Sequence, residues 1–171
     1  KNVIRPDLLI KCNFKNIIEI PRIEKIIINI GVKEAAQDNK KIIPPALILE
    51  LITGQKSFQT KAKKSIALFR LRKNSLIGCK VTLQNDRMYS FLDRLIAIIL
   101  PRIKDFQGFS HNSFDSKGNF TLGINDCLIF PEIEEQYEKL DNIYGLNISI
   151  ITTAKNKLDG KMLLSGLQIP M

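Results

Sequence analysis

Lysine and arginine side chains gather in one stretch of the sequence, where their chemistry is that of phosphate binding. Between Leu51 and Asn85 there are eight of them and no aspartate or glutamate, whereas the rest of the chain holds 18 bases against 17 acids. Nearly all of the net charge of +9 therefore falls on this basic stretch, which predicts a binding surface for a polyanion. The eight bases are Lys56, Lys61, Lys63, Lys64, Arg70, Arg72, Lys73 and Lys80.

RNA suits this stretch better than a membrane does. The longest apolar run, Leu95–Leu100, has six residues between Arg94 and Arg102, whereas a membrane-spanning helix needs roughly 20. Lysines and arginines that meet phosphates release counterions, so we expect an affinity for RNA that falls as salt is added. Phe69 and Arg70 are adjacent and could stack on an unpaired base. A solvated loop or a targeting signal is the alternative interpretation.

The sequence carries little that an enzyme or a metal site needs. Residues Gly54–Ser57 partly match a phosphate-binding loop, but that motif has glycine directly before lysine and a second glycine five residues earlier. His111 is the single histidine and lies in a polar segment. Cys12, Cys79 and Cys127 are far apart, whereas a zinc site needs about four ligands at local spacing. We expect no catalytic residue, no metal, no cofactor and reduced cysteines.

Alternating side chains predict strands that would place polar groups beside the basic stretch. Isoleucine-rich Ile23–Ile30 favours a strand with three isoleucines on one face and Asn29 on the other. In Cys79–Leu83 the same period of two turns Lys80 and Thr82 away from Val81 and Leu83. Further strands are expected over residues 55–60, 120–124 and 147–153. The amides and hydroxyl of Asn29, Gln55 and Thr82 suit 2′-hydroxyls and base edges, or else they cap strand ends.

Apolar periodicity predicts the helices. The clearest covers residues 86–99, with Asp86 as N-cap, one wide apolar face, and an end or a bend at Pro101. Pro44-Pro45 is expected to open or kink a helix over residues 46–52. Short helices are also expected after Pro6 and over residues 161–167.

The remaining segments favour exposed surface and a single domain. The polar, basic residues 65–77 predict an exposed loop. Residues 132–141 predict an acidic face that is solvated or contacts a basic protein. No internal repeat and no linker interrupts the chain, so we expect one domain over residues 1–171.

Several segments, taken together and in order, resemble one family across essentially the whole chain. They are Pro21–Gly31, Ile52–Lys56, Thr60–Ile66, Phe69–Arg72, Ile77–Leu83, Arg87–Leu95, Leu100–Arg102, Ser113–Asp115, Gly118–Ile124 and Phe130–Ile133. With these motifs the chain resembles the bacterial-type large-subunit ribosomal protein five family, which binds 5S ribosomal RNA.

The resemblance implies a fold, a function and a set of binding residues. The expected fold is α+β, an antiparallel sheet backed by helices on one face, with an exposed basic loop. The expected function is structural and not enzymatic: members bind 5S rRNA through the sheet face and large-subunit rRNA in the central protuberance. The residues that match the family's rRNA-binding positions, or lie among them, are Asn29, Gln55, Lys56, Thr60, Lys61, Lys63, Lys64, Lys80 and Thr82.

The same resemblance implies further partners. The loop over residues 65–78 matches the one that approaches peptidyl-site tRNA, with Phe69, Arg70, Leu71, Arg72 and Lys73 expected near its tip. Neighbouring ribosomal proteins, including one that bridges to the small subunit, are also expected partners. A chain rich in isoleucine, lysine and asparagine on this bacterial-type body favours a mitochondrial ribosome in the matrix, with a plastid or a bacterial cytoplasm as alternatives.

The chain departs from the family pattern in several places. Pro44-Pro45 should make its helix start late or kink, Leu68 replaces a small residue, and His111-Asn112 stands where bases are common. Residues 132–141 are more acidic than usual, and the tail from Lys161 lacks the usual acidic helix start. Two other classes remain as alternatives, a stand-alone RNA-binding or RNA-chaperone module and a phosphotransferase that binds nucleotide at Lys56.

Overall fold

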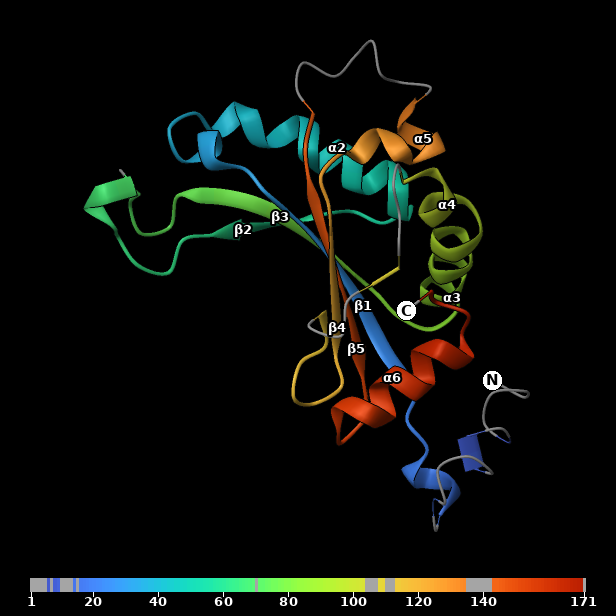
Figure 1. Ribbon diagram of the computed structural model, residues 1–171. Helices are drawn as coiled ribbons and strands as arrows, with labels where there is room; N and C mark the ends of the chain where they lie inside the picture. Colours follow the sequence, from blue (N-terminus) through green and yellow to red (C-terminus); the bar gives the residue numbers. More distant parts are fainter. Residues whose placement is uncertain are drawn as a thin grey trace. The chain divides into compact units, whose positions relative to one another are not determined.

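The computed structural model describes Pro6, Leu8, Leu9, Phe14 and residues 16–69, 71–103, 108–109, 113–134 and 143–170. It has a five-stranded antiparallel sheet of order β2-β3-β1-β5-β4 accompanied by helices, which is the α+β class expected (Figure 1). The chain divides into two compact units. The first unit is residues 1–26, 84–122 and 149–171, and the second unit is residues 27–83 and 123–148. The single domain expected over residues 1–171 stays a prediction.

All five expected strands are present, four of them with shifted ends. They are β1 Ile23–Gly31, β2 Phe58–Lys61, β3 Leu76–Leu83, β4 Phe120–Ile124 and β5 Leu146–Thr152. In β1 the isoleucines expected to share one face, Ile26, Ile28 and Ile30, have no exposed surface. Burial of alternate apolar side chains therefore fixes the register of the central strand, because a slip by one residue would expose all three.

In the second unit, α2 (Ile43–Thr53) packs against β3. Pro44 and Pro45 lie in its first turn, where missing N–H groups cost nothing. The prediction that the pair opens the helix is therefore confirmed, although the helix begins at Ile43 and not at residue 46. Gly54 ends the helix in the left-handed conformation, with φ of 63°, and donates its N–H to the Glu50 carbonyl at 2.8 Å. Short 3₁₀ turns lie at Lys33–Ala36, Asn39–Ile42, Ala67–Phe69 and Cys127–Ile129, and α5 covers Pro131–Glu134.

In the first unit, one helical run continues from α3 (Asn85–Arg94) through a π-helical turn, Leu95–Ile99, to α4 (Leu100–Arg102). Asp86 is not its N-cap, because Gln84 holds that position and Asp86 lies in the first turn. Pro101 lies within the run, which ends one residue later at Arg102. Its ring excludes the carbonyl one turn back, and the wider turn lets Leu100 donate to the Leu95 carbonyl instead.

The same unit contains the turn before β4 and the closing helix. Helix α6 covers Lys157–Gly166 and so begins four residues earlier than expected. The Thr152 hydroxyl donates to the Gly118 carbonyl at 2.9 Å, and the Thr152 N–H donates to Asn119 Oδ1 at 3.1 Å. Pro6, Leu8 and Leu9 are helical, as expected. Within the described residues, no helix is long and apolar enough to cross a membrane.

Candidate nucleic-acid interface

Two adjoining strands present a polar face in the second unit. β2 pairs antiparallel with β3, with Phe58 opposite Lys80 and Thr60 opposite Gly78. Cys79, Val81 and Leu83 alternate with these residues and are buried, and α2 packs against this strand. Lys80 and Thr82 are exposed, and Asn29 of β1 is half-buried between fully buried isoleucines. The predicted division of β1 and β3 into an apolar and a polar face is therefore confirmed.

The residues that follow α2 lie in a turn and not in a strand. The Thr53 hydroxyl donates to the Leu49 carbonyl at 2.6 Å and accepts the Gln55 N–H at 3.3 Å. Ser57 donates its N–H to Glu50 Oε1 at 3.0 Å. Gln55 thus precedes β2 and is half-buried, which corrects the strand expected from residue 55, while Lys56 is exposed beside it.

Beyond β2, the basic stretch continues through residues 62–69 and 71–75, here called the ribbon, to β3 (Figure 1). Backbone hydrogen bonds hold the base of this ribbon together. Ala62 is buried, accepts a hydrogen bond from the Asn74 N–H, and donates its own N–H to the Ser75 carbonyl, both at 2.9 Å. Lys61, Lys63 and Lys64 are exposed around this anchor. Because the anchor is made by the backbone and one small side chain, the three ammonium groups are left on the surface.

The far end of the ribbon is closed by two backbone hydrogen bonds. Ile66 and Leu71 donate N–H groups to each other's carbonyls at 2.9 Å and 3.1 Å. Between them, Leu68 is 85% exposed and Phe69 is 64% exposed. Lys73 donates its N–H to Ser65 Oγ at 2.9 Å, and both Arg72 and Lys73 are exposed. Arg70, expected at this tip, lies outside the described residues.

The cations of this surface have no carboxylate partner in the described part of the chain. The ion pairs there join Lys25 to Glu24, Lys41 to Glu34 and Lys155 to Glu19, all outside the basic stretch. Glu50, the carboxylate that precedes the basic stretch, accepts from Ser57 instead. Exposed, unneutralised ammonium and guanidinium groups of this kind are what phosphate contact requires.

A groove brings together residues of this surface that the sequence did not predict to be neighbours. Lys61, Arg72 and Lys73 line one open hollow in the second unit. Its other polar lining consists of Gln37, Asn39, Gln59, Asn74 and Ser75. Gln37 and Asn39 come from the segment before α2, and no periodicity in the sequence marks them. The groove couples three cations with four carboxamides, a combination that can meet both phosphate and sugar or base groups.

Two comparisons of the whole chain bear on what this surface is for. The family model "Ribosomal protein L5" matches residues 16–72, and the model of the C-terminus of the same ribosomal protein family matches residues 76–171. The chain belongs to the ribosomal protein L5 family. It is 52% identical over 171 residues to "Large ribosomal subunit protein uL5m" of Reclinomonas americana, which covers all of this chain and 94% of that protein. It is 56% identical over 167 residues to "Large ribosomal subunit protein uL5" of Moorella thermoacetica, with 98% and 92% covered.

Membership of the L5 family makes the protein a structural, non-enzymatic constituent of the large ribosomal subunit. The resemblance drawn from the sequence motifs is thereby confirmed. The roles of the individual residues predicted to bind rRNA and tRNA stay predictions.

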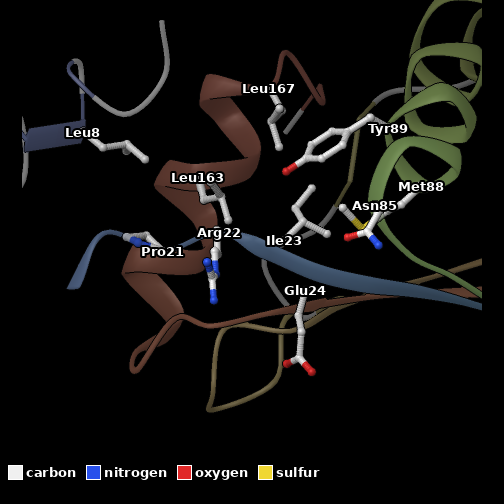
Figure 2. A pocket seen from close by; sticks show the side chains of 10 residues that line it. All are labelled: Leu8, Pro21, Arg22, Ile23, Glu24, Asn85, Met88, Tyr89, Leu163 and Leu167. Atoms are coloured by element: carbon white, nitrogen blue, oxygen red, sulfur yellow. The ribbon is translucent and has the colours of Figure 1, made fainter. Parts of the chain in front are cut away.

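The first unit of this L5-family protein contains a separate cavity of about 280 Å³ (Figure 2). Figure 2 shows the Tyr89 ring of α3 directed toward Leu167 and Ile23. Arg22, Glu24 and Asn85 add polar groups to a lining that is otherwise mostly apolar. Lys56 does not line it, so this cavity is not the nucleotide site considered at Lys56.

The cysteines of the described chain are buried thiols. Burial raises the pKa of Cys79 to about 11, and the nearby Glu50 carboxylate adds to the shift. Burial likewise raises the pKa of Cys127. Both thiols are free, and the described residues hold no group of three or more His, Cys, Asp or Glu that could bind a metal. Cys12 and His111 lie outside the described residues.

Proposed function

We propose that the protein binds 5S rRNA and large-subunit rRNA in the central protuberance through the polar face of its second unit. The observation that carries this proposal is the set of exposed cations around β2 and β3 that have no carboxylate partner in the described chain. Membership of the L5 family supports it, since the two family models together cover residues 16–72 and 76–171 and so include nearly all of this surface.

The rRNA contacts divide by chemistry. Lys56, Lys61, Lys63, Lys64 and Lys80 contribute phosphate contacts, which supply affinity that depends on salt. Asn29, Gln55, Thr60 and Thr82 contribute amide and hydroxyl groups, which suit the 2′-hydroxyls and base edges of RNA. The exposure of Lys80 and Thr82 on one face of β3 supports this division.

The closed tip of the ribbon is the part proposed to approach peptidyl-site tRNA. Leu68 and Phe69 are the exposed apolar groups there, and Arg72 and Lys73 follow them as exposed cations. An aromatic ring near cations suits a nucleotide whose base is unpaired. Neighbouring ribosomal proteins, including a small-subunit protein, are the remaining proposed partners.

The compartment proposed is the mitochondrial ribosome. The uL5m relative from Reclinomonas americana supports this choice, while the bacterial uL5 relative is about as similar and keeps a bacterial or plastid ribosome as the alternative.

A gel-shift titration of the protein against a 5S rRNA transcript, at two salt concentrations and with tRNA as competitor, tests the proposal. We expect tight binding that weakens with salt by a slope of roughly 0.7 to 0.9 per phosphate contact and that tRNA does not compete away. Equal binding to both RNAs would contradict 5S recognition by the isolated protein. Co-sedimentation with large subunits then separates site recognition within a particle from general RNA binding.

A further inference from the structure

Phe58 exposes an aromatic ring on the polar face, at the start of the edge strand β2. Its side chain is 66% exposed, although it begins a strand. It lies opposite Lys80 in the antiparallel ladder, and the Lys80 ammonium is 5.7 Å from the centre of the ring. An ammonium within about 6 Å of a ring centre is held by the ring's negative face.

The neighbouring pair completes a small patch on one face of the two strands. Thr60 follows Phe58 by two residues and lies opposite Gly78, so both pairs point to the same side. A Cβ on Gly78 would come within 3.3 Å of the Thr60 hydroxyl oxygen. The patch thus combines an aromatic ring, a cation and a hydroxyl.

This combination selects a particular ligand. A basic surface repels a cationic partner, and a ring of this exposure offers a flat apolar face to an anionic polymer. Of the anionic polymers, single-stranded nucleic acid is the one whose bases stack on aromatic side chains while its phosphates meet lysines.

We propose that Phe58 stacks on an unpaired base of the bound rRNA, with Lys80 on a phosphate of the same strand. The inference rests on the proposed rRNA binding by this face and adds a residue that the motif analysis did not assign to the site. It places a looped-out or unpaired nucleotide of the RNA against β2.

The chain offers a direct test because it contains no tryptophan. Phe58→Trp introduces a single indole at the patch, and titration with a 5S rRNA transcript should strongly quench its fluorescence. Leu158→Trp is the matched control, since Leu158 is 68% exposed but lies on α6 in the first unit, and its fluorescence should change little. Thermal unfolding of each variant verifies that the fold is kept.

Affinity supplies the second measurement. Loss of one stacked base costs about 1–3 kcal/mol, so Phe58→Leu should weaken 5S binding by about 5- to 150-fold. The salt slope should stay unchanged because no phosphate contact is removed, and Phe58→Tyr should restore the affinity. Either an unquenched Phe58→Trp or a Phe58→Leu variant that binds within about twofold of the wild-type protein overturns the stacking inference. Failure of the wild-type protein itself to bind 5S rRNA would instead count against the proposed function.

Discussion

Gly118 lies too close to Gly160 for Gly160 to carry a side chain. A Cβ on Gly160 would be 2.4 Å from the Gly118 carbonyl oxygen and 2.7 Å from its Cα. Gly118 also has φ of 74°, a conformation that side chains disfavour. The contact ties the turn before β4 to helix α6 within the first unit, and its two glycines are 42 positions apart in the sequence.

Replacing Gly160 with alanine should therefore destabilise the protein. In an unhindered helix the same change would stabilise by about 1 kcal/mol, but here the backbone of Gly118 must move, at a cost of about 1–3 kcal/mol. Urea unfolding should show a lower midpoint. Gly31→Ala serves as control, because nothing lies within 4 Å of a Cβ there. A Gly160→Ala midpoint at or above that of the wild-type protein would refute the packing argument.

Reversing the charge of Lys61, Lys63 and Lys64 to glutamate should abolish 5S binding and leave the fold intact. All three side chains are exposed and have no carboxylate partner in the described chain, so their removal breaks no ion pair there. The gel shift measures binding, and circular dichroism with thermal unfolding measures the fold. Unchanged binding would disprove the phosphate assignment.

A matched triple reversal controls for net charge alone. Lys117 and Lys157 are exposed and Lys161 is half-buried, and all three belong to the first unit, outside the basic stretch. Their reversal to glutamate changes the net charge of the protein equally. This variant should retain most of the affinity for 5S rRNA, because the local cations and not the overall charge meet the phosphates.

Altering the ribbon tip should perturb tRNA and spare assembly. Alanine at Phe69, Arg70 and Leu71 removes the tip side chains, while the backbone hydrogen bonds between Ile66 and Leu71 can still close it. Sucrose-gradient sedimentation should find the variant in large subunits at the wild-type level. Peptidyl-site tRNA should bind those ribosomes more weakly. Loss of the variant from the large subunit would instead place the tip on rRNA.

The Cys79 thiol should make stability fall at alkaline pH. Its pKa is raised from 9.0 to about 11 in the folded protein, so between these values the unfolded chain loses the proton first. The contribution of the protonated Cys79 thiol to the free energy of unfolding is complete below pH 9. It is lost as pH rises toward 11, by roughly 2–3 kcal/mol. Urea unfolding across this window should show a steeper decline for the wild-type protein than for Cys79→Ala. Parallel declines would mean that the thiol ionises equally in both states.

The sequence predicted strands and faces better than it predicted ends and turns. Alternation in β1 and β3 correctly placed Asn29, Lys80 and Thr82 on the face away from the buried side chains, because burial of every second side chain is a strong, local constraint. Gln55 was misplaced since Thr53 and Glu50 bind the turn after α2 through side-chain hydrogen bonds. Asp86 was predicted to be the N-cap because aspartate is favoured both at the N-cap and in the first turn of a helix, and residue type alone does not distinguish the two.

The groove and the aromatic patch could not be predicted from the sequence and were found only in the structure. Gln37 and Asn39 reach the groove because their segment folds beside the ribbon, a tertiary arrangement that no spacing along the chain encodes. A phenylalanine in a strand, such as Phe58, would ordinarily be assigned to the buried face. Its exposure follows from the position of β2, where only one neighbouring strand is present.

That position has a consequence for the protein before any RNA is bound. β2 is the outermost strand of the sheet, and its outward backbone groups have no strand partner in the described chain, so it could pair with a second copy and start aggregation. The strand is only four residues long, its pairing is irregular between Thr60 and Lys61, and lysines flank it. Short length, irregularity and charge are the means by which proteins discourage such pairing. The lysines proposed to bind rRNA phosphates thus also disfavour pairing between free copies of the protein.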